Sequence, residues 1–387
     1  MAMKLLMLVI FFAIMVSVGI YARKHATSVD GYVLGGRSVG PWLTAFAYGT
    51  SYFSAVVFVG YAGQFGWKYG LASTWIGIGN AMIGSLLAWV ILGRRTKVMT
   101  QHLSAKTMPD FFGQRYGSKS LKIVASVIVF VFLIPYTASV YNGLSRLFGM
   151  AFNIPYKYCV IGMAVFTGIY VILGGYMATA INDFIQGIIM LGGIVAVILA
   201  VLNGQGGFIQ AIKTMAEIPS DVPVTMGQPG AFTSFFGPDP LNLLGVVILT
   251  SLGTWGLPQM VGKFYAIKDE KSINTGTVLS TLFAIVISGG CYFLGGFGRL
   301  FDASELHDEA GNMIFDGIIP HMLSTLPDIL IGIVVVLVLS ASMSTLASLV
   351  LTSSSTLTLD FLKPSSLAIS TERTTGSFWL KIRIVSR

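Results

Sequence analysis

Hydroxyl-bearing residues gather at the centre of an apolar segment that covers residues 41–65. The group consists of Thr50, Ser51, Tyr52 and Ser54. Polar groups at the middle of a membrane helix are costly, so they are candidates for function. If the helix breaks there, its freed backbone carbonyls are suited to coordinate a cation. Packing of a small polar face against a neighbouring helix explains the pattern equally well.

A second polar group interrupts the apolar segment 328–359. Ser344 and Thr345 place two hydroxyl oxygens side by side, and sodium, as a hard cation, is expected to favour oxygen ligands. Ser340 and Ser348 share a helix face with Ser344 through their i, i+4 spacing. The alternative is helix packing, because Ser and Thr hydroxyls commonly bond back to the carbonyl of residue i−4.

Two further residues are unusual for their surroundings. Asp183 begins the apolar segment 183–202 and has no Lys or Arg near it in the sequence. Its position suits a helix cap and also a cation ligand or proton carrier in a water-filled vestibule, and neither role excludes the other. Pro258 lies inside the segment 241–262, where proline removes a backbone donor and kinks a helix. Broken helices in corresponding places of two halves indicate a transporter binding site.

The elements that position these residues are predicted to be transmembrane helices. Of the 387 residues, 54% are hydrophobic and 10% are charged, whereas soluble domains carry about 25% charged residues. The chain is therefore predicted to be a multi-pass membrane protein surrounded by lipid. About nine apolar runs are long enough to span a bilayer, near 3–21, 41–65, 72–93, 123–149, 158–176, 183–202, 241–262, 275–298 and 328–359. The first is predicted to be a helix and not a signal peptide, since it has no clear cleavage site.

Basic residues fall on one side of the membrane if the helices alternate. They follow the first, third and seventh runs and include Arg23, Lys24, Arg37, Arg94, Arg95, Lys106, Lys122, Lys263, Lys268 and Lys271. The positive-inside rule makes this side cytoplasmic and the N-terminus external, in the plasma membrane. The net charge of +8 is explained by these loops, so no nucleic-acid partner is expected.

Enzymatic chemistry is not indicated. Cys159 and Cys291 lie within apolar runs without a partner at metal-ligand spacing, and the four histidines are scattered. The sequence holds no nucleophile–base pair, metal-ligand cluster or phosphate-binding loop placed for catalysis. We expect no catalytic residues and no organic cofactor.

Several of these stretches resemble the sodium:solute symporter family, which includes bacterial proline and pantothenate symporters and sodium/sugar transporters. The matching pieces lie at 32–41, 108–112, 173–186, 256–259 and 343–346. They occur in the family's order, over roughly residues 30–360 of this sequence. The region around Pro258 is closer to the proline and pantothenate branch than to the sugar branch.

The resemblance implies an all-α, leucine-transporter-type fold of two inverted five-helix repeats. In that fold, 1–361 would be the transporter domain, with an extra helix at 1–22 and the first repeat at 41–202. A partial second repeat would cover 241–361, and 362–387 would be a basic cytoplasmic tail. Two further core helices are expected after Asp360 but are not found, which suggests a frameshift, a premature stop or a natural short form.

The resemblance also assigns roles. The sodium site would use the carbonyls of Thr50, Phe53 and Ala341 and the hydroxyls of Ser344 and Thr345. Asp183, with Ser348, would assist a second ion or the release path. The solute would lie near Tyr52, Ser54, Tyr136, Trp255 and Pro258. Proline symporters carry Asp at the position of Tyr52, which argues against a strict proline assignment.

We therefore expect sodium-coupled secondary active symport of a small organic solute by alternating access. The solute would be an amino acid such as proline or a carboxylate such as pantothenate, and sodium would be the coupling ion. Two alternatives remain: a truncated form that does not transport, and an uncoupled channel or facilitator. The facilitator would show flux without sodium coupling.

Overall fold

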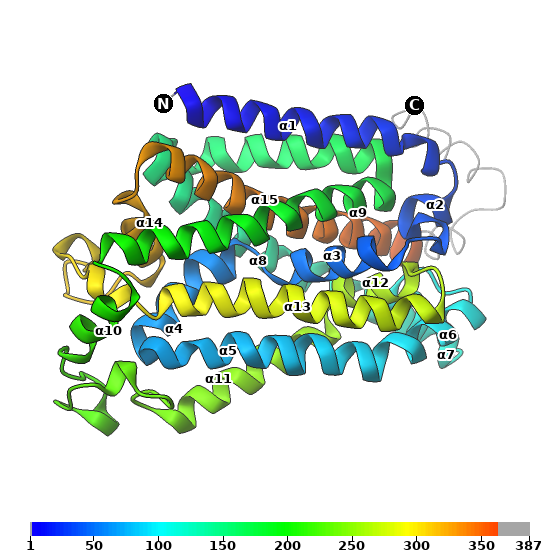
Figure 1. Ribbon diagram of the computed structural model, residues 1–387. Coiled ribbons are helices and arrows are strands. Elements are labelled where there is room, and N and C mark those ends of the chain that lie inside the picture. Colours follow the sequence, from blue (N-terminus) through cyan, green and yellow to red (C-terminus); the bar gives the residue numbers. More distant parts are fainter. Residues whose placement is uncertain (1, 363–387) are drawn as a thin grey trace.

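A computed structural model describes residues 2–362 of the chain, and Figure 1 shows these residues as an elongated bundle of helices that run side by side. The described residues contain no β-strand beyond two isolated bridges, Val39–Ile267 and His307–Met313. The predicted tail, 362–387, lies outside the described residues except for Leu362.

Five helices are long. They are α1 (Ala2–Ala22), α8 (Lys119–Phe152), α9 (Tyr156–Gly204), α13 (Glu270–Gly295) and α15 (Asp328–Ser355). The shorter α-helices are α2 (Val29–Leu34), α3 (Pro41–Tyr52), α4 (Ala62–Tyr69), α5 (Thr74–Gly79), α6 (Arg94–His102), α7 (Met108–Arg115), α10 (Phe208–Ala216), α11 (Pro240–Leu252), α12 (Pro258–Ala266) and α14 (Phe315–Ser324). Wider π-helical turns continue these elements at η3 (Val56–Tyr61), η5 (Asn80–Leu87), η6 (Trp89–Gly93) and η12 (Thr356–Leu362).

Turns inside two long helical segments account for the number of membrane crossings. The described residues hold six helices long and apolar enough to span, or seven if the bent pair α11–α12 is one span. Two of the six turn back on themselves at glycines with positive φ: Gly70 (φ 60°) between α4 and α5, and Gly175 (φ 54°) inside α9. With the bent pair counted as one span and each of those two segments counted twice, the described residues hold nine helical passes, the number of apolar runs in the sequence.

Both helices that were expected to be irregular are broken. Pro41 starts α3, which ends at Tyr52, and Phe53 is extended (φ −106°, ψ 90°) before the chain becomes helical again. In the other helix, Leu257 is extended (ψ 122°), Pro258 is the first residue of α12, and α12 is bent by 53° from the helix before it. Proline fits the first turn of a helix because it needs no backbone donor there.

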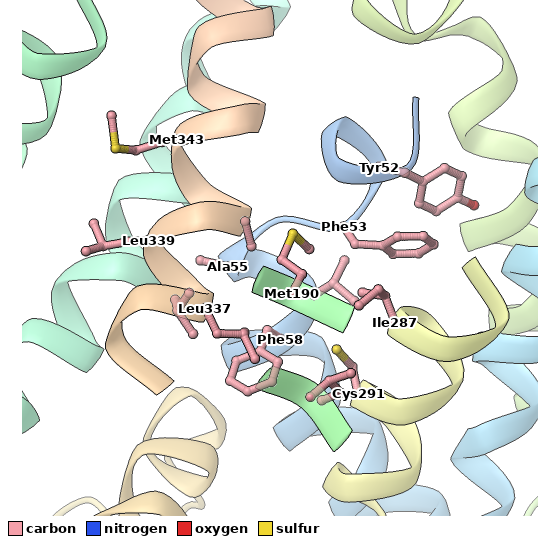
Figure 2. Packing of buried hydrophobic residues seen from close by; sticks show 14 of the residues in the cluster. Tyr52, Phe53, Ala55, Phe58, Met190, Ile287, Cys291, Leu337, Leu339 and Met343 are labelled. Carbon is pink, nitrogen blue, oxygen red and sulfur yellow. The ribbon is translucent and has the colours of Figure 1, made fainter. Parts of the chain in front are cut away.

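Apolar side chains surround the break in α3. Figure 2 shows Phe53 and Ala55 close to Met190 of α9 and to Ile287 and Cys291 of α13. All five side chains are buried and belong to one continuous core. Cys291 is a free, buried thiol, which agrees with its prediction as a small core residue. The broken backbone is therefore largely surrounded by buried apolar side chains, where its freed carbonyls need partners.

The two broken helices are joined at the basic end of the bundle. In Figure 1 the N-terminus lies at one end of the bundle, and α2, α6, α7 and α12 lie at the other. Val39 donates to the carbonyl of Ala266 (3.2 Å) and accepts from Lys268 (2.9 Å), which links the start of α3 to the end of α12. Arg37 donates to the carbonyl of Ala105 (2.6 Å) from the same loop. The basic residues thus gather at the end away from the N-terminus, as expected.

Candidate ion and solute site

The carbonyl of Thr50 is released by the break in α3. Phe53 donates to Gly49 (3.2 Å) in the last backbone bond of the helix, so the next carbonyl has no helical donor. It accepts instead from the hydroxyls of Ser344 (3.1 Å) and Thr345 (3.4 Å), which lie in α15. A break in one helix and a hydroxyl pair in another therefore meet.

The carbonyl of Ala341 completes this group. Ser344 and Thr345 each lie 3.1 Å from it, as in ordinary i−3 and i−4 bonds within a helix. Two carbonyls and two hydroxyls thus converge, and all four residues are buried. The bonds to Ala341 are those expected from helix packing, whereas the bonds to Thr50 require the break. Four uncharged oxygens form a ligand set suited to a small hard cation.

Phe53 is the fifth residue of the predicted sodium site. It lies at the break itself and is buried. Its carbonyl makes no hydrogen bond with α15 among the described residues, so the structure brings four of the five predicted residues into contact and places Phe53 three residues along the chain.

A second polar group lies one helical turn nearer the basic end of α15. Ser348 shares a hydrogen bond with Ser51 of α3 (2.9 Å) and accepts another from the ammonium of Lys263 (3.0 Å). The same ammonium lies 3.5 Å from the Oδ2 of Asp183. Four helices, α3, α9, α12 and α15, therefore contribute to one buried polar cluster.

Two sequence predictions about this cluster are wrong. Asp183 is not a helix cap: α9 is capped at Pro155, turns at Gly175, and continues past Asp183 as a buried helix. Asp183 also has a cation beside it, because Lys263 is not a loop residue but lies buried in α12. The sequence alone does not show this, since the pair is separated by 80 positions and the apolar run that precedes Lys263 ends at residue 262.

A small cavity of about 50 Å³ adjoins the cluster on its basic side. Tyr176, Lys263 and Ser348 line it, together with the loop residues Lys106 and Thr107. Of the five predicted solute residues, Pro258 alone lines this cavity. The cavity lies between the polar cluster and the loop residues at the basic end of the bundle.

Three of the other predicted solute residues, Tyr52, Ser54 and Tyr136, lie at the break in α3, and Trp255 lies just before Pro258 in the other broken helix. The Tyr52 hydroxyl donates to the Thr250 carbonyl (3.1 Å), and the Trp255 ring nitrogen donates to the Ile83 carbonyl (3.1 Å). Tyr136 of α8 lies close to the Ser54 side chain and to Tyr52. Tyr52 and Tyr136 thus connect the break in α3 to α11 and α8, whereas Trp255 connects the other broken helix to η5.

Comparison with known proteins decides the family. The model of the sodium:solute symporter family matches residues 32–380. The chain belongs to this family. Sodium/proline symporters of Staphylococcus aureus strains JH9 and NCTC 8325 are each 32% identical to it over 373 residues, which is 92% of this chain and 68% of theirs. This symporter is therefore a transporter and not an enzyme, and sodium-coupled transport of a solute is its general function.

A solved structure shares the fold of this symporter. It is described as the substrate-bound outward-open state of a Na⁺-coupled sialic acid symporter, with a TM-score of 0.76 and 17% identity. The alignment covers 92% of this chain and 73% of the other. The architecture is thus the leucine-transporter-type helical bundle that the resemblance implied. Its division into repeats at 41–202 and 241–361 remains a prediction.

The matching segment at 108–112 lies at the basic end of this symporter and ties three elements together. Thr107 caps α7 and donates to Asp360 of η12 (2.5 Å). Lys122 of α8 lies 2.7 Å from Asp110 and 3.1 Å from Asp360. Burial raises the pKa of the Asp110 carboxyl, but hydrogen bonds from Lys122 and from neighbouring donors outweigh it, so this pKa is lowered from its ordinary value.

Two functional candidates were missed by reasoning from sequence. Lys263 was counted only as a loop charge, although its position five residues after a helix-breaking proline was a signal that it lies within the span. Arg37 was also counted as a loop charge, although it donates to the carbonyls of Ala105 (2.6 Å) and Tyr265 (3.3 Å). Arg37, which precedes α3, thereby links the loop at Ala105 to the end of α12 at Tyr265.

Proposed function

We propose that this chain binds one sodium ion among Thr50, Phe53, Ala341, Ser344 and Thr345 and uses it to drive uptake of a small amino acid such as proline. The observation that supports this best is the meeting of the two α15 hydroxyls with the carbonyl freed at the break in α3. Uncharged oxygens in a buried site match the requirements of sodium.

Coupling follows from where the site lies. The oxygens come from α3 and α15, which belong to different parts of the bundle, so a bound cation would stabilise the arrangement in which these helices are close. A ligand shifts a conformational equilibrium only by its differential affinity for the two states. Solute that binds the same arrangement then gains affinity from sodium, and sodium from solute.

The solute class is proposed from the relatives and from the site. The curated relatives are named sodium/proline symporters. The proposed solute residues, Tyr52, Ser54, Tyr136, Trp255 and Pro258, combine aromatic faces with hydroxyl groups, which suits a small molecule with an apolar body and polar ends. A carboxylate such as pantothenate is the second candidate, because Tyr52 stands where proline symporters carry Asp.

We also propose that the basic end of the bundle is cytoplasmic and the N-terminus external, in the plasma membrane. The basic residues at that end support this orientation through the positive-inside rule. Sodium would then enter from outside, and the membrane potential would contribute about 2.3 kcal/mol per charge per 100 mV. Cysteine labelling from outside at position 3, compared with position 268, tests the orientation.

Uptake by the purified chain in liposomes tests the function. Radiolabelled proline should accumulate under an inward sodium gradient and not under an equal potassium gradient, and unlabelled proline should compete better than pantothenate. Ser344→Ala should move the sodium dependence to about 10- to 100-fold higher sodium, while Ser342→Ala, whose hydroxyl bonds only within its own helix (2.7 Å to Val338), should keep the wild-type dependence.

The two alternative functions predict different results in this uptake assay combined with a measurement of thermal stability in sodium. Proline flux that is equal with and without sodium would identify a facilitator. Sodium-dependent stabilisation without any uptake of proline or pantothenate would identify a form that binds the ion but does not transport. Loss of sodium dependence in both serine variants would refute the assignment of the ion site.

A further inference from the structure

The ammonium group of Lys263 is placed as a bound cation would be. Its Nζ lies 3.0 Å from the hydroxyl of Ser348 and 3.5 Å from the Oδ2 of Asp183. It also faces the ring of Tyr176, 5.3 Å from the centroid, within the range of cation–π attraction. A hydroxyl, a carboxylate and an aromatic face thus surround one positive charge.

This charge is almost completely buried. The side chains of Lys263 and Asp183 are 3% and 1% exposed, respectively. A buried charge in a membrane protein is tolerated when it is paired, and Asp183 is the only acidic group paired with Lys263 among the described residues. The pair is therefore locally neutral, and neither partner has charge left over for a further ion.

We infer that Lys263 is a tethered cation that fills the second ion position, the one formed by Asp183 and Ser348, so that this chain binds sodium at one place only. This inference rests on the proposed function, in that the resemblance assigns Asp183 and Ser348 to a second ion or to the release path. The chain thus departs from that assignment: the ion is supplied by the protein itself.

The ligands of this position are already in use. The Ser348 hydroxyl contacts both Lys263 and the Ser51 hydroxyl. Of the two carboxylate oxygens of Asp183, Oδ1 has no hydrogen-bond partner in the described part of the chain. A single free oxygen does not make a sodium site. A sodium ion would also be repelled by the neighbouring ammonium.

The tether has a mechanical consequence. Lys263 belongs to α12, the second half of a broken helix, whereas Asp183 and Ser348 belong to α9 and α15. A free ion would leave when the helices separate, but the lysine remains covalently attached to α12. Its charge therefore holds α12 against α9 and α15 and does not add to the number of ions transported.

Equilibrium binding of ²²Na⁺ to the purified full chain tests the inference. Wild type should bind one sodium per chain, with a hyperbolic dependence that Ser344→Ala weakens about 10- to 100-fold and Ser342→Ala retains. Lys263→Ala should open the second position and raise the bound sodium to two per chain. The added ion should be lost again in Lys263→Ala/Asp183→Asn. Lys268→Ala, which removes an exposed lysine from the following loop, should remain at one.

A second measurement does not depend on sodium. Ethylammonium resembles the end of a lysine side chain, so it should raise the melting temperature of Lys263→Ala but not that of wild type or of Lys263→Ala/Asp183→Asn. If neither the wild type nor any variant binds sodium, the proposed function fails. The effect of ethylammonium on the melting temperature of Lys263→Ala still tests the role of Lys263.

Two results would overturn the inference. One is a wild type that binds two sodium ions and loses one of them in Ser348→Ala, a measurement that does not require a lysine variant to fold. The other is a folded Lys263→Ala chain that still binds one sodium and gains no stability from ethylammonium. Either result would mean that the lysine is not the second cation.

Discussion

The hydroxyl of Ser344 lies 3.1 Å from the backbone carbonyl of Thr50, across 294 positions of sequence. The contact exists because α3 ends two residues after Thr50, which leaves that carbonyl without its helical donor. A hydroxyl in α15 and a break in α3 therefore depend on each other. Removing either one should disturb the other more than it disturbs the rest of the bundle.

Replacing Ser344 by Ala should weaken sodium binding about 10- to 100-fold, because one oxygen ligand to a charged group contributes about 1.5–3 kcal/mol. Thr345→Val should act similarly while keeping the side-chain shape. The midpoint of sodium-dependent thermal stabilisation measures the change, since a ligand that binds the folded state raises its stability.

Ser342→Ala is the matched control for both variants. Its hydroxyl is equally buried but bonds only to Val338 in its own helix (2.7 Å). Its sodium midpoint should stay within about twofold of wild type, a difference of less than 0.5 kcal/mol. Equal effects of Ser342→Ala and Ser344→Ala would show that any buried hydroxyl in α15 matters, and the ion site would lose its support.

Neutralising one member of the Lys263–Asp183 pair should destabilise the protein strongly. Lys263→Met and Asp183→Asn should each lower the free energy of unfolding by about 3–5 kcal/mol, because each leaves an uncompensated buried charge. The double variant should lose less than the sum of the two, with a coupling of about 1–3 kcal/mol. These four proteins, the wild type, the two single variants and the double variant, form a double-mutant cycle. Unfolding in detergent, followed by circular dichroism, measures the stability of each.

The exposed pair Arg94–Glu270 serves as the comparison. Its side chains are 75% and 49% exposed, and such surface pairs contribute about 0–1 kcal/mol. The corresponding cycle, Arg94→Met with Glu270→Gln, should show little coupling. Additive losses in the buried cycle as well would mean that Lys263 and Asp183 are not paired in the folded protein.

The sequence predicts the breaks well because their causes are local. Pro258 marks one break directly, and the polar residues after Gly49 mark the other. The meeting of Thr50 with Ser344 could be expected only from the family resemblance, since nothing in either segment specifies its partner. The long apolar runs likewise predict membrane crossings, because their length and composition are sufficient for that purpose.

The buried ion pair could not be predicted, for two physical reasons. The turn between the fifth and sixth crossings is made by Gly175 alone, without the usual cluster of polar turn residues, so the next helix starts earlier than expected and Asp183 lies inside it. Lys263 follows a bend of 53°, and the direction of its side chain depends on that bend. The pattern of residue types along the sequence predicts neither the early start of the helix after Gly175 nor the bend before Lys263.

The stability contributed by Asp110 should depend on pH in a defined direction. Its pKa is lowered from the ordinary value of 3.8, so the contribution is complete above that value and disappears as the pH falls through the folded-state pKa. Asp110→Asn should therefore cost about 1–3 kcal/mol at pH 7. The difference from wild type should shrink below about pH 4, where the wild-type carboxylate is also protonated.

Asp30→Asn is the control for this pH dependence. Asp30 pairs with Lys106 (3.1 Å) but is 55% exposed, so its loss should cost less than about 1 kcal/mol. Thermal melts of the two variants from pH 3 to 7 make the comparison. A cost for Asp110→Asn that stays constant across that range would contradict the assignment of its stabilising role to the charged form.

Gly175 should tolerate no side chain, because it makes the turn inside α9. Its φ of 54° and ψ of −144° are open to glycine alone, and an added Cβ would lie 2.6 Å from the Tyr32 carbonyl oxygen and 2.8 Å from its ring. Gly175→Ala should cost at least about 1–3 kcal/mol from backbone strain. Gly168→Ala, in the same helix with no heavy atom within 4 Å of the added Cβ, should stabilise by up to about 1 kcal/mol. Melting temperatures in detergent separate the two, and an unchanged value for Gly175→Ala would mean that the fifth and sixth crossings are joined in some other way.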